Sequence, residues 1–243
     1  MPRTAAALII GNEILTGKIR EANVYVLARE MRLLGVNLRR VVVCSDEIDV
    51  IAYDLNALRE AHDFVFTSGG VGPTHDDVTL AAVATSFERP LVRCAEIEEL
   101  LRGYWGDRIT QEHLRMATMP EGARLLTNDE IRWPVIAIGN VYVLPGVPQI
   151  FEAKLRLLRE EIGAATPYVS RALFTSADEG AIASLLEAVE AAYPSVAIGS
   201  YPRWRDERYK VKVTFDGLDP RAVDDALASC RAAIGEDRVV AVE

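Results

Sequence analysis

The residues best suited to chemistry lie in one glycine-rich segment, Ser68-Gly69-Gly70-Val71-Gly72-Pro73-Thr74-His75-Asp76-Asp77. Its glycines permit positive φ angles and let the backbone approach a ligand without a Cβ in the way. Consecutive free N–H groups in such a loop bind anions, and a following helix N-terminus adds partial positive charge. We therefore predict a phosphate-binding loop with these ligand-binding residues: Ser68, Gly69, Gly70, Gly72, Pro73 and Thr74.

Four carboxylates accompany this loop. Asp76 and Asp77 are expected to open the next helix, where one caps the helix and the other holds a divalent cation beside the phosphate. Glu13 follows the first predicted strand and Asp46 ends the second, so both can project into the same crevice. The structural alternative is a tight turn whose aspartates only cap a helix.

Two further loops extend the candidate site. Gly11 and Asn12 directly follow the first predicted strand, and we take both as ligand-binding residues. Gly146, between Pro145 and Pro148, admits a close backbone approach, although a rigid turn into the next helix explains the prolines equally well. The loop at Ser68 is not a Walker motif because it lacks the Gly-Lys-Ser/Thr ending, and it does not fit Gly-x-Gly-x-x-Gly.

Alternating strands and helices are predicted to position these loops. Short apolar runs alternate with helical periodicity from residue 5 to about 165. The expected strands are 5–10, 38–44, 63–67 and 140–144, and the expected helices are 23–34, 47–61, 76–87, 95–104 and 149–162. This order implies right-handed βαβ units, hence a three-layer α/β/α domain with a mostly parallel sheet. Ligands bind such sheets at the carboxyl ends of the strands.

A second, smaller domain is predicted after the linker Gly163-Ala164-Ala165-Thr166-Pro167. We place the α/β domain at residues 1–165 and the small domain at 168–243. The latter contains a strand (169–175), a helix (178–193), two strands (196–201 and 208–215), a helix (220–235) and a strand (239–242). This βαββαβ order is that of the ferredoxin-like α+β fold. Its basic and aromatic segment, 201–212, fits either contact with RNA or phosphate, or a solvated sheet face.

Composition excludes several classes of partner. The formal net charge of −9 over 243 residues argues against a broad nucleic-acid-binding surface. The first apolar run is too short for a membrane span or a signal peptide, so we expect neither membrane nor export. Three cysteines without metal-ligand spacing fit a reducing cytoplasm, and we expect all of them to be buried: Cys44, Cys94 and Cys230.

Aromatic and histidine residues give weaker signals. Trp105 and Trp133 stand where an aromatic ring can stack on an adenine or flavin, although packing in a core is the more frequent role. His75 adjoins the aspartates, but a solvated loop histidine explains it equally well. His62 and His113 have no partner within sequence reach and are expected to be structural.

Taken together, these motifs resemble the molybdopterin-binding domain family. The matching segments are Gly11-Asn12-Glu13, Gly17, Asn23, 68–79, Met116-Ala117, Asn128 and 145–148, in the family's order, and Ser200-Tyr201-Pro202 is similar to its second domain. Within the family, the chain looks most like the N-terminal domain of competence/damage-inducible protein CinA and the related domain of FAD synthases.

The resemblance implies a three-layer α/β fold that tends to oligomerise, so we expect a cytoplasmic homo-oligomer. In this branch it implies a metal-dependent pyrophosphatase acting on ADP-ribose or FAD-like dinucleotides. Carried onto this sequence, it makes Asp76, Asp77 and Glu13 the candidate catalytic residues, and Asp46, Asp76 and Asp77 the candidate ligands of Mg²⁺, Mn²⁺ or Co²⁺. Other branches bind molybdopterin and adenylylate it or load molybdate. A non-catalytic module that binds a nucleotide through the same loop is the third possibility.

One segment departs from the family pattern. After Asn128 the chain reads Asp129-Glu130-Ile131-Arg132-Trp133-Pro134, where the family usually carries a Gly-Thr-Ala-Pro-Gly-like loop. The substrate is therefore left open, and this variant is more similar to the FAD synthase branch. CinA proteins typically add a nicotinamide mononucleotide deamidase domain, and FAD synthases an adenylyltransferase domain. From these 243 residues we expect neither deamidation nor FAD synthesis.

Overall fold

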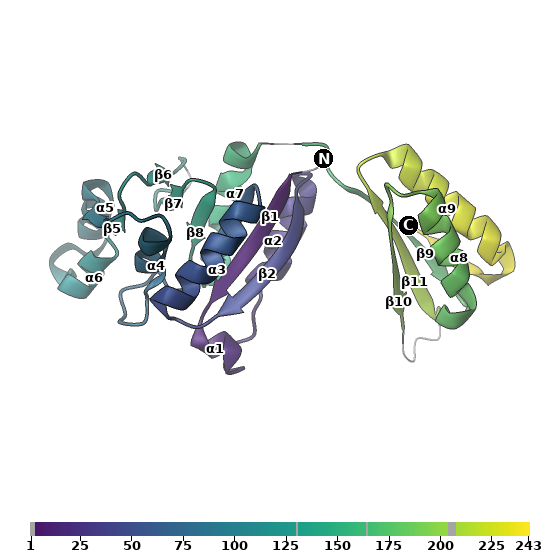
Figure 1. Ribbon diagram of the computed structural model, residues 1–243, viewed down its shortest axis with the longest axis horizontal. Coiled ribbons are helices and arrows are strands. Elements are labelled where there is room, and N and C mark those ends of the chain that lie inside the picture. The colour runs from purple at the N-terminus through teal and green to yellow at the C-terminus, as the bar shows by residue number, and fades with distance from the viewer. Residues whose placement is uncertain (1–2, 130, 164, 204–207) are drawn as a thin grey trace. The chain divides into compact units, whose positions relative to one another are not determined.

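The chain forms two compact units, Met1–Ala165 and Thr166–Glu243. The computed structural model in Figure 1 describes residues 3–129, 131–163, 165–203 and 208–243. Glu130, Ala164 of the expected linker, and residues 204–207 of the basic segment lie outside the described residues.

The first unit is built on a six-stranded sheet of order β2-β1-β3-β8-β7-β6. Its strands are β1 (Thr4–Ile10), β2 (Asn37–Cys44), β3 (Phe64–Ser68), β6 (Arg124–Leu126), β7 (Val135–Ile138) and β8 (Val141–Leu144). Strands β2, β1, β3 and β8 pair in parallel, whereas β7 and β6 form an antiparallel edge. The predicted mostly parallel sheet is confirmed.

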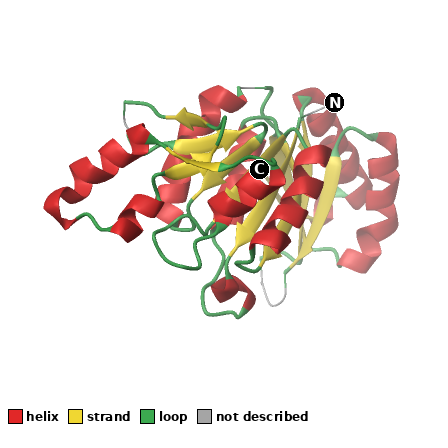
Figure 2. Ribbon diagram, turned by 60° about the vertical axis from the view of Figure 1, so that its left-hand side comes forward, coloured by secondary structure: helices red, strands yellow, loops and turns green. Residues whose placement is uncertain are grey.

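Helices pack on both faces of this sheet, as the coloured elements of Figure 2 illustrate. The helices of the unit are α1 (Asn12–Leu15), α2 (Asn23–Leu33), α3 (Ile48–Ala61), α4 (Thr79–Ser86), α5 (Ala95–Trp105), α6 (Gln111–Arg115) and α7 (Pro148–Ile162). Successive side chains of a strand point to opposite faces. Accordingly, Ala5, Ala7 and Ile9 pack in one core with α2 and α7, while Ala6, Leu8 and Ile10 pack in another with α3 and α4. The result is the predicted three-layer α/β/α architecture.

The start of α4 was predicted wrongly. This helix begins at Thr79, so Asp76 and Asp77 lie in the preceding turn and do not open it. The Asp77 carboxylate accepts a hydrogen bond of 2.8 Å from the Thr74 N–H and another from the Thr74 hydroxyl. Because Thr74–Asp77 form this hydrogen-bonded turn, Asp76 and Asp77 do not form the first turn of α4.

Short elements between α4 and β7 escaped the sequence patterns. A 3₁₀ turn (Gly106–Arg108) links α5 to α6, and β4 (Leu91–Arg93) pairs with β5 (Thr118–Pro120) in a separate two-stranded sheet. Runs of three residues carry no readable periodicity, which explains why they were missed. The two strands enclose an insertion, residues 91–120, which contains α5 and α6 and has a hydrophobic core of its own.

The second unit has the expected βαββαβ order. Its elements are β9 (Val169–Thr175), α8 (Glu179–Ala192), β10 (Ala197–Pro202), β11 (Val211–Gly217), α9 (Pro220–Ile234), a 3₁₀ turn (Glu236–Arg238) and β12 (Val239–Val242). The sheet order β10-β11-β9-β12 is antiparallel throughout, which is the ferredoxin-like arrangement. Val211, Val213 and Phe215 alternate into its core.

One strand of this unit begins later than predicted. Strand β11 starts at Val211, so Arg208 and Lys210 do not share a strand face with Lys212. The Lys210 ammonium instead lies 3.0 Å from the Asp178 carboxylate. Asp178, the expected first residue of the helix, directly precedes α8, and its side chain makes this ion pair and does not cap the helix.

Two composition-based expectations can also be examined. All three cysteines are buried free thiols, as predicted. Among the described residues, none of the helices combines the length and apolar character needed to span a bilayer.

Candidate functional site

The turn after β3 requires glycine at two positions. Gly69 and Gly70 have φ angles of 108° and 63°, which L-residues with a side chain rarely adopt. A Cβ at Gly69 would collide with the Ile10 carbonyl oxygen, and one at Gly70 with the Thr79 hydroxyl. The backbone here therefore runs close to the first loop and to α4 because no side chain intervenes.

Three consecutive N–H groups of this turn are free. The Gly69 N–H donates to the Leu144 carbonyl at 3.2 Å, and the Thr74 N–H is taken by Asp77. Between them, the N–H groups of Gly70, Val71 and Gly72 donate no hydrogen bond to any described residue. Unpaired donors on successive residues suit an anion. Of the amides in the predicted nest, those of Gly70, Val71 and Gly72 are therefore the ones left without an acceptor among the described residues.

These residues border a cavity of about 750 Å³ within the first unit. Small-molecule sites commonly have volumes of roughly 300 to 1,000 Å³. The predicted site residues that line it are Glu13, Gly69, Gly70, Gly72, Asp77 and Gly146. All three predicted loops therefore contribute to one site.

Asn23 connects the loops behind the cavity. Its side-chain amide donates to the Ser68 hydroxyl at 2.8 Å and to the Gly146 carbonyl at 2.9 Å. Asn23 and Ser68 are buried, with 4% and 3% of their surface exposed. Ser68 therefore holds the loops together and is not among the described residues that line the cavity.

Asp46 has a similar supporting part. Its carboxylate accepts a 2.7 Å hydrogen bond from the Asn12 N–H, which ties the first loop to the end of β2. The Gly11 N–H is likewise bound, to the Cys44 carbonyl at 3.2 Å. Neither Asp46, Gly11 nor Asn12 is among the described lining residues. These three residues therefore stabilise the first loop, and Glu13 is the residue of that loop that lines the cavity.

Asp76, Pro73 and Thr74 also lie outside the described lining of the cavity. The Asp76 side chain is 60% exposed, and its neighbour His75 is 93% exposed. Asp77, by contrast, lies against Gly72, where an added Cβ would be 2.6 Å from its carboxylate. Of the adjacent aspartates, Asp77 is the one the structure brings to the cavity.

A preassembled metal cage is not part of this site. In the described ranges of the chain, no group of three or more His, Cys, Asp or Glu side chains is arranged to hold a metal ion. Glu13 and Asp77 are the carboxylates of the described cavity wall. Mg²⁺ typically binds through one or two carboxylates together with substrate phosphates and water, so this pair is compatible with that mode.

Sequence reasoning missed Lys154, which lines the cavity from α7. Only 5% of its surface is exposed, and its ammonium donates to the Pro134 carbonyl at 2.5 Å. Burial lowers the pKa of Lys154 to about 8. A signal was available: Lys154 falls on the same helical face as Phe151, Leu155 and Leu158, all of them buried.

The remaining wall is apolar and aromatic. Trp133 and Pro134 come from the segment that departs from the family pattern, so this segment forms part of the cavity. Trp105 lines it too, while its ring stacks on His113 at 4.0 Å between centroids. The other apolar lining residues of α5 and its surroundings are Ile97, Leu101, Tyr104 and Met116.

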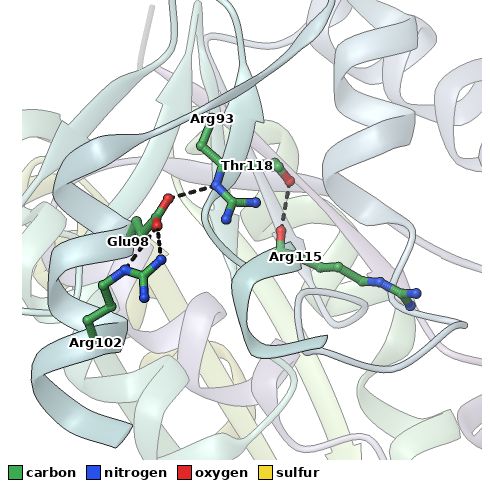
Figure 3. Close-up of polar contacts among 5 residues, drawn as sticks. All are labelled: Arg93, Glu98, Arg102, Arg115 and Thr118. Atoms are coloured by element: carbon green, nitrogen blue, oxygen red, sulfur yellow. Dashed lines mark hydrogen bonds and ion pairs between the residues drawn. The ribbon is translucent and has the colours of Figure 1, made fainter. Parts of the chain in front are cut away.

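Polar contacts stabilise the insertion of residues 91–120 (Figure 3). The Glu98 carboxylate on α5 accepts from Arg93 at 2.7 Å and from Arg102 at 3.0 Å. These arginines lower the pKa of Glu98, Arg93 more strongly. The Thr118 hydroxyl donates to the Arg115 carbonyl at 2.8 Å, just after α6. These contacts anchor the ends of the insertion, which supplies much of the apolar wall of the cavity.

The sequence model of the protein family described as "Probable molybdopterin binding domain" matches residues 6–163 of this chain. The chain belongs to this family. A second model, "FAD synthase, middle domain", matches residues 167–243. The resemblance predicted from the loop motifs is thereby confirmed.

Individual relatives agree with this assignment. A probable FAD synthase of Caenorhabditis elegans is 31% identical over 94% of this chain and 49% of its own length. A protein of Archaeoglobus fulgidus is 30% identical over 94% of this chain and 97% of its own length. The crystal structure of CinA, of unknown function, from Thermoplasma acidophilum has 30% identity and a TM-score of 0.61, covering 66% of this chain and 99% of that one. The chain thus spans about half the length of the FAD synthases it matches.

Proposed function

We propose that the first unit binds a phosphate-bearing nucleotide or pterin, with a phosphate on the N–H groups of Gly70, Val71 and Gly72. The observation that carries this proposal is the three consecutive unpaired donors at the edge of a cavity of about 750 Å³. Backbone amides that are already oriented bind an anion without having to reorganise, which favours phosphate over a neutral group.

The rest of the cavity suits a planar ring. Trp105 and Trp133 offer aromatic faces, and Ile97, Leu101 and Ile136 add apolar surface. Large ligand sites combine mostly apolar walls with a few placed polar groups, as here. Molybdopterin, FAD and ADP-ribose each unite a phosphate with a ring system, so they are the ligands to test. The family name and the names of the relatives support the same choice.

If the first unit is an enzyme, we propose that it forms or breaks the diphosphate linkage of this ligand. Adenylyl transfer forms such a linkage and hydrolysis breaks it, so both reactions need the same charges to be neutralised. Similarity to proteins named FAD synthase favours transfer. Glu13 favours hydrolysis, since its exposed carboxylate at the cavity is free to accept a proton from water. A bound Mg²⁺, Mn²⁺ or Co²⁺ would neutralise phosphate charge during either reaction.

Calorimetric titration of the full chain with ADP-ribose, FAD and molybdopterin would test the binding proposal, with Mg²⁺ present and after EDTA treatment. We expect saturable binding of at least one ligand. Absence of binding to all three would contradict the proposal.

The reaction is then decided by products. Release of AMP from ADP-ribose or FAD identifies hydrolysis, whereas pyrophosphate release from ATP with molybdopterin identifies adenylylation. Binding with neither product leaves a non-catalytic nucleotide or pterin module.

A further inference from the structure

Lys154 carries a buried ammonium to which no described residue supplies a counter-ion. Its side chain sits on the wall of the cavity with 5% of its surface exposed. Within the described residues its ammonium donates to one acceptor, the neutral Pro134 carbonyl, and forms no ion pair. An ammonium has three donors, so two are left over.

Keeping such a group in the core of a domain costs free energy. A buried charge is normally paired, because otherwise its lost hydration is not replaced. Nearby Arg156, on the same helix, follows the usual pattern: it is 61% exposed and paired with Glu152. A lysine that served only to hold the Pro134 carbonyl would not need to border a cavity.

The position of Lys154 also separates it from the amide nest. Helix α7 begins at Pro148, directly after the loop of Gly146, where an added Cβ would lie 3.4 Å from the Gly69 Cα. Lys154 lies six residues later, about 9 Å along the helix axis at 1.5 Å per residue. Lys154 and the nest therefore border the cavity from different elements, α7 and the loop after β3.

We infer that Lys154 is a second anion-binding point of the cavity, which donates to a negatively charged oxygen of the same ligand that the amides of Gly70–Gly72 hold. This inference rests on the proposed function and adds to it a requirement on the ligand. The ligand must carry two acceptor groups, such as two phosphates of a dinucleotide. Lys154 acts in binding and specificity, and no chemical step is assigned to it.

The test is calorimetric titration of wild type, Lys154→Met, Lys154→Arg and the control Arg156→Met with FAD and ADP-ribose, and with AMP as a single-phosphate probe. We expect Kd for the dinucleotides to rise by about tenfold or more in Lys154→Met, the range for hydrogen bonds to charged groups. Lys154→Arg should keep part of the affinity, and Arg156→Met should match wild type. AMP should lose less than the dinucleotides.

A second measurement covers the case in which Lys154→Met fails to fold. Wild-type protein is acetylated with limiting acetic anhydride, with and without FAD or ADP-ribose, and modification of Lys154 is measured by mass spectrometry. The reference is Lys18, which is exposed and is not among the described residues that line the cavity. Ligand should slow the acetylation of Lys154 and leave Lys18 unaffected.

The outcomes separate this inference from the proposed function. Unchanged Kd in Lys154→Met, or no protection of Lys154 by a ligand that binds, overturns the inference and leaves the proposed function standing. Failure of wild type to bind any ligand overturns both.

Discussion

The Asn23 side-chain amide donates a 2.8 Å hydrogen bond to the Ser68 hydroxyl at the end of β3. The same nitrogen reaches the Gly146 carbonyl at 2.9 Å, in the loop before α7. One side chain at the start of α2 thus joins this helix to the glycine loop and to the third loop. Since both acceptors adjoin residues of the cavity wall, this junction fixes the spacing of the loops that form the site.

Replacing Asn23 with Ala is expected to lower the free energy of unfolding by about 1 to 3 kcal/mol, because the buried Ser68 hydroxyl and the partly buried Gly146 carbonyl lose their donor. Urea unfolding of the full chain measures the change. Asn37→Ala is the matched control, since the Asn37 side chain is exposed, and it should alter stability by less than about 0.5 kcal/mol. Equal effects of the two substitutions would argue against the junction.

Gly70→Ala is expected to damage the anion site directly. The φ angle of 63° disfavours any residue with a Cβ by about 1 to 2 kcal/mol, and the added carbon would displace the Thr79 hydroxyl. Phosphate-ligand affinity should fall by roughly tenfold or more, measured by calorimetry.

The control for this substitution is Gly180→Ala. Gly180 lies in α8 of the second unit, where an added Cβ meets no atom within 4 Å. A helical Gly→Ala change typically adds about 0.5 to 1 kcal/mol of stability, and ligand affinity should not change. Retained affinity in Gly70→Ala would show that the phosphate binds elsewhere.

Much of this fold follows from sequence patterns. Strands β9 and β12 begin and end at the predicted residues, and β1, β2 and α3 agree to within a residue at either end. Strong periodicity and apolar runs made these elements readable, because each must bury one face or both. The wrong start of α4 has a local cause: Asp77 bonds to Thr74 and forms a turn, a competition that side-chain type alone does not decide.

The site was predictable in its loops and less so in its individual side chains. Glycine positions revealed where the backbone must approach a ligand, and Gly69, Gly70, Gly72 and Gly146 do line the cavity. The carboxylates could not be sorted, since sequence does not show that Asp46 binds the Asn12 N–H away from the described cavity wall while Asp77 binds the Thr74 N–H and lies on that wall. Lys154 was missed because a lysine within a helix is normally solvated.

Asp77→Asn should weaken any dependence on divalent cations. The amide oxygen can still accept from Thr74, so the substitution removes charge more than structure. If Asp77 holds a cation, Mg²⁺-dependent turnover should fall by about 10²-fold, since charge stabilisation is usually the largest catalytic contribution. Asp76→Asn is the control: its side chain is 60% exposed, and the rate should change less than about threefold. A larger loss in Asp76→Asn would reverse the assignment of the two aspartates.

Stability of the ligand-free protein should increase with pH in the alkaline range through Lys154. Burial lowers the pKa of Lys154 from 10.5 to about 8, so between these values the unfolded chain binds more protons than the folded one. The free energy of unfolding therefore rises from pH 8 towards 10.5, by on the order of 1 to 3 kcal/mol. Urea unfolding at several pH values, with Lys154→Met subtracted to remove other titrations, measures this slope. Parallel profiles for both proteins would contradict the burial of a titrating ammonium.

Ligand affinity should show the opposite pH trend, because only the protonated form of Lys154 attracts an anion. Bound phosphate favours that form, so affinity for FAD or ADP-ribose is expected to be constant near pH 7 and to fall above pH 8, by up to about tenfold per pH unit. The other titratable groups of the described cavity wall are Glu13, Asp77 and Tyr104. Subtracting the pH profile of Lys154→Met removes the contribution of these groups and isolates that of Lys154. Calorimetry of wild type against Lys154→Met checks it: the variant should bind weakly and without pH dependence, and a wild-type affinity that is flat from pH 7 to 9 would exclude an ammonium–anion contact.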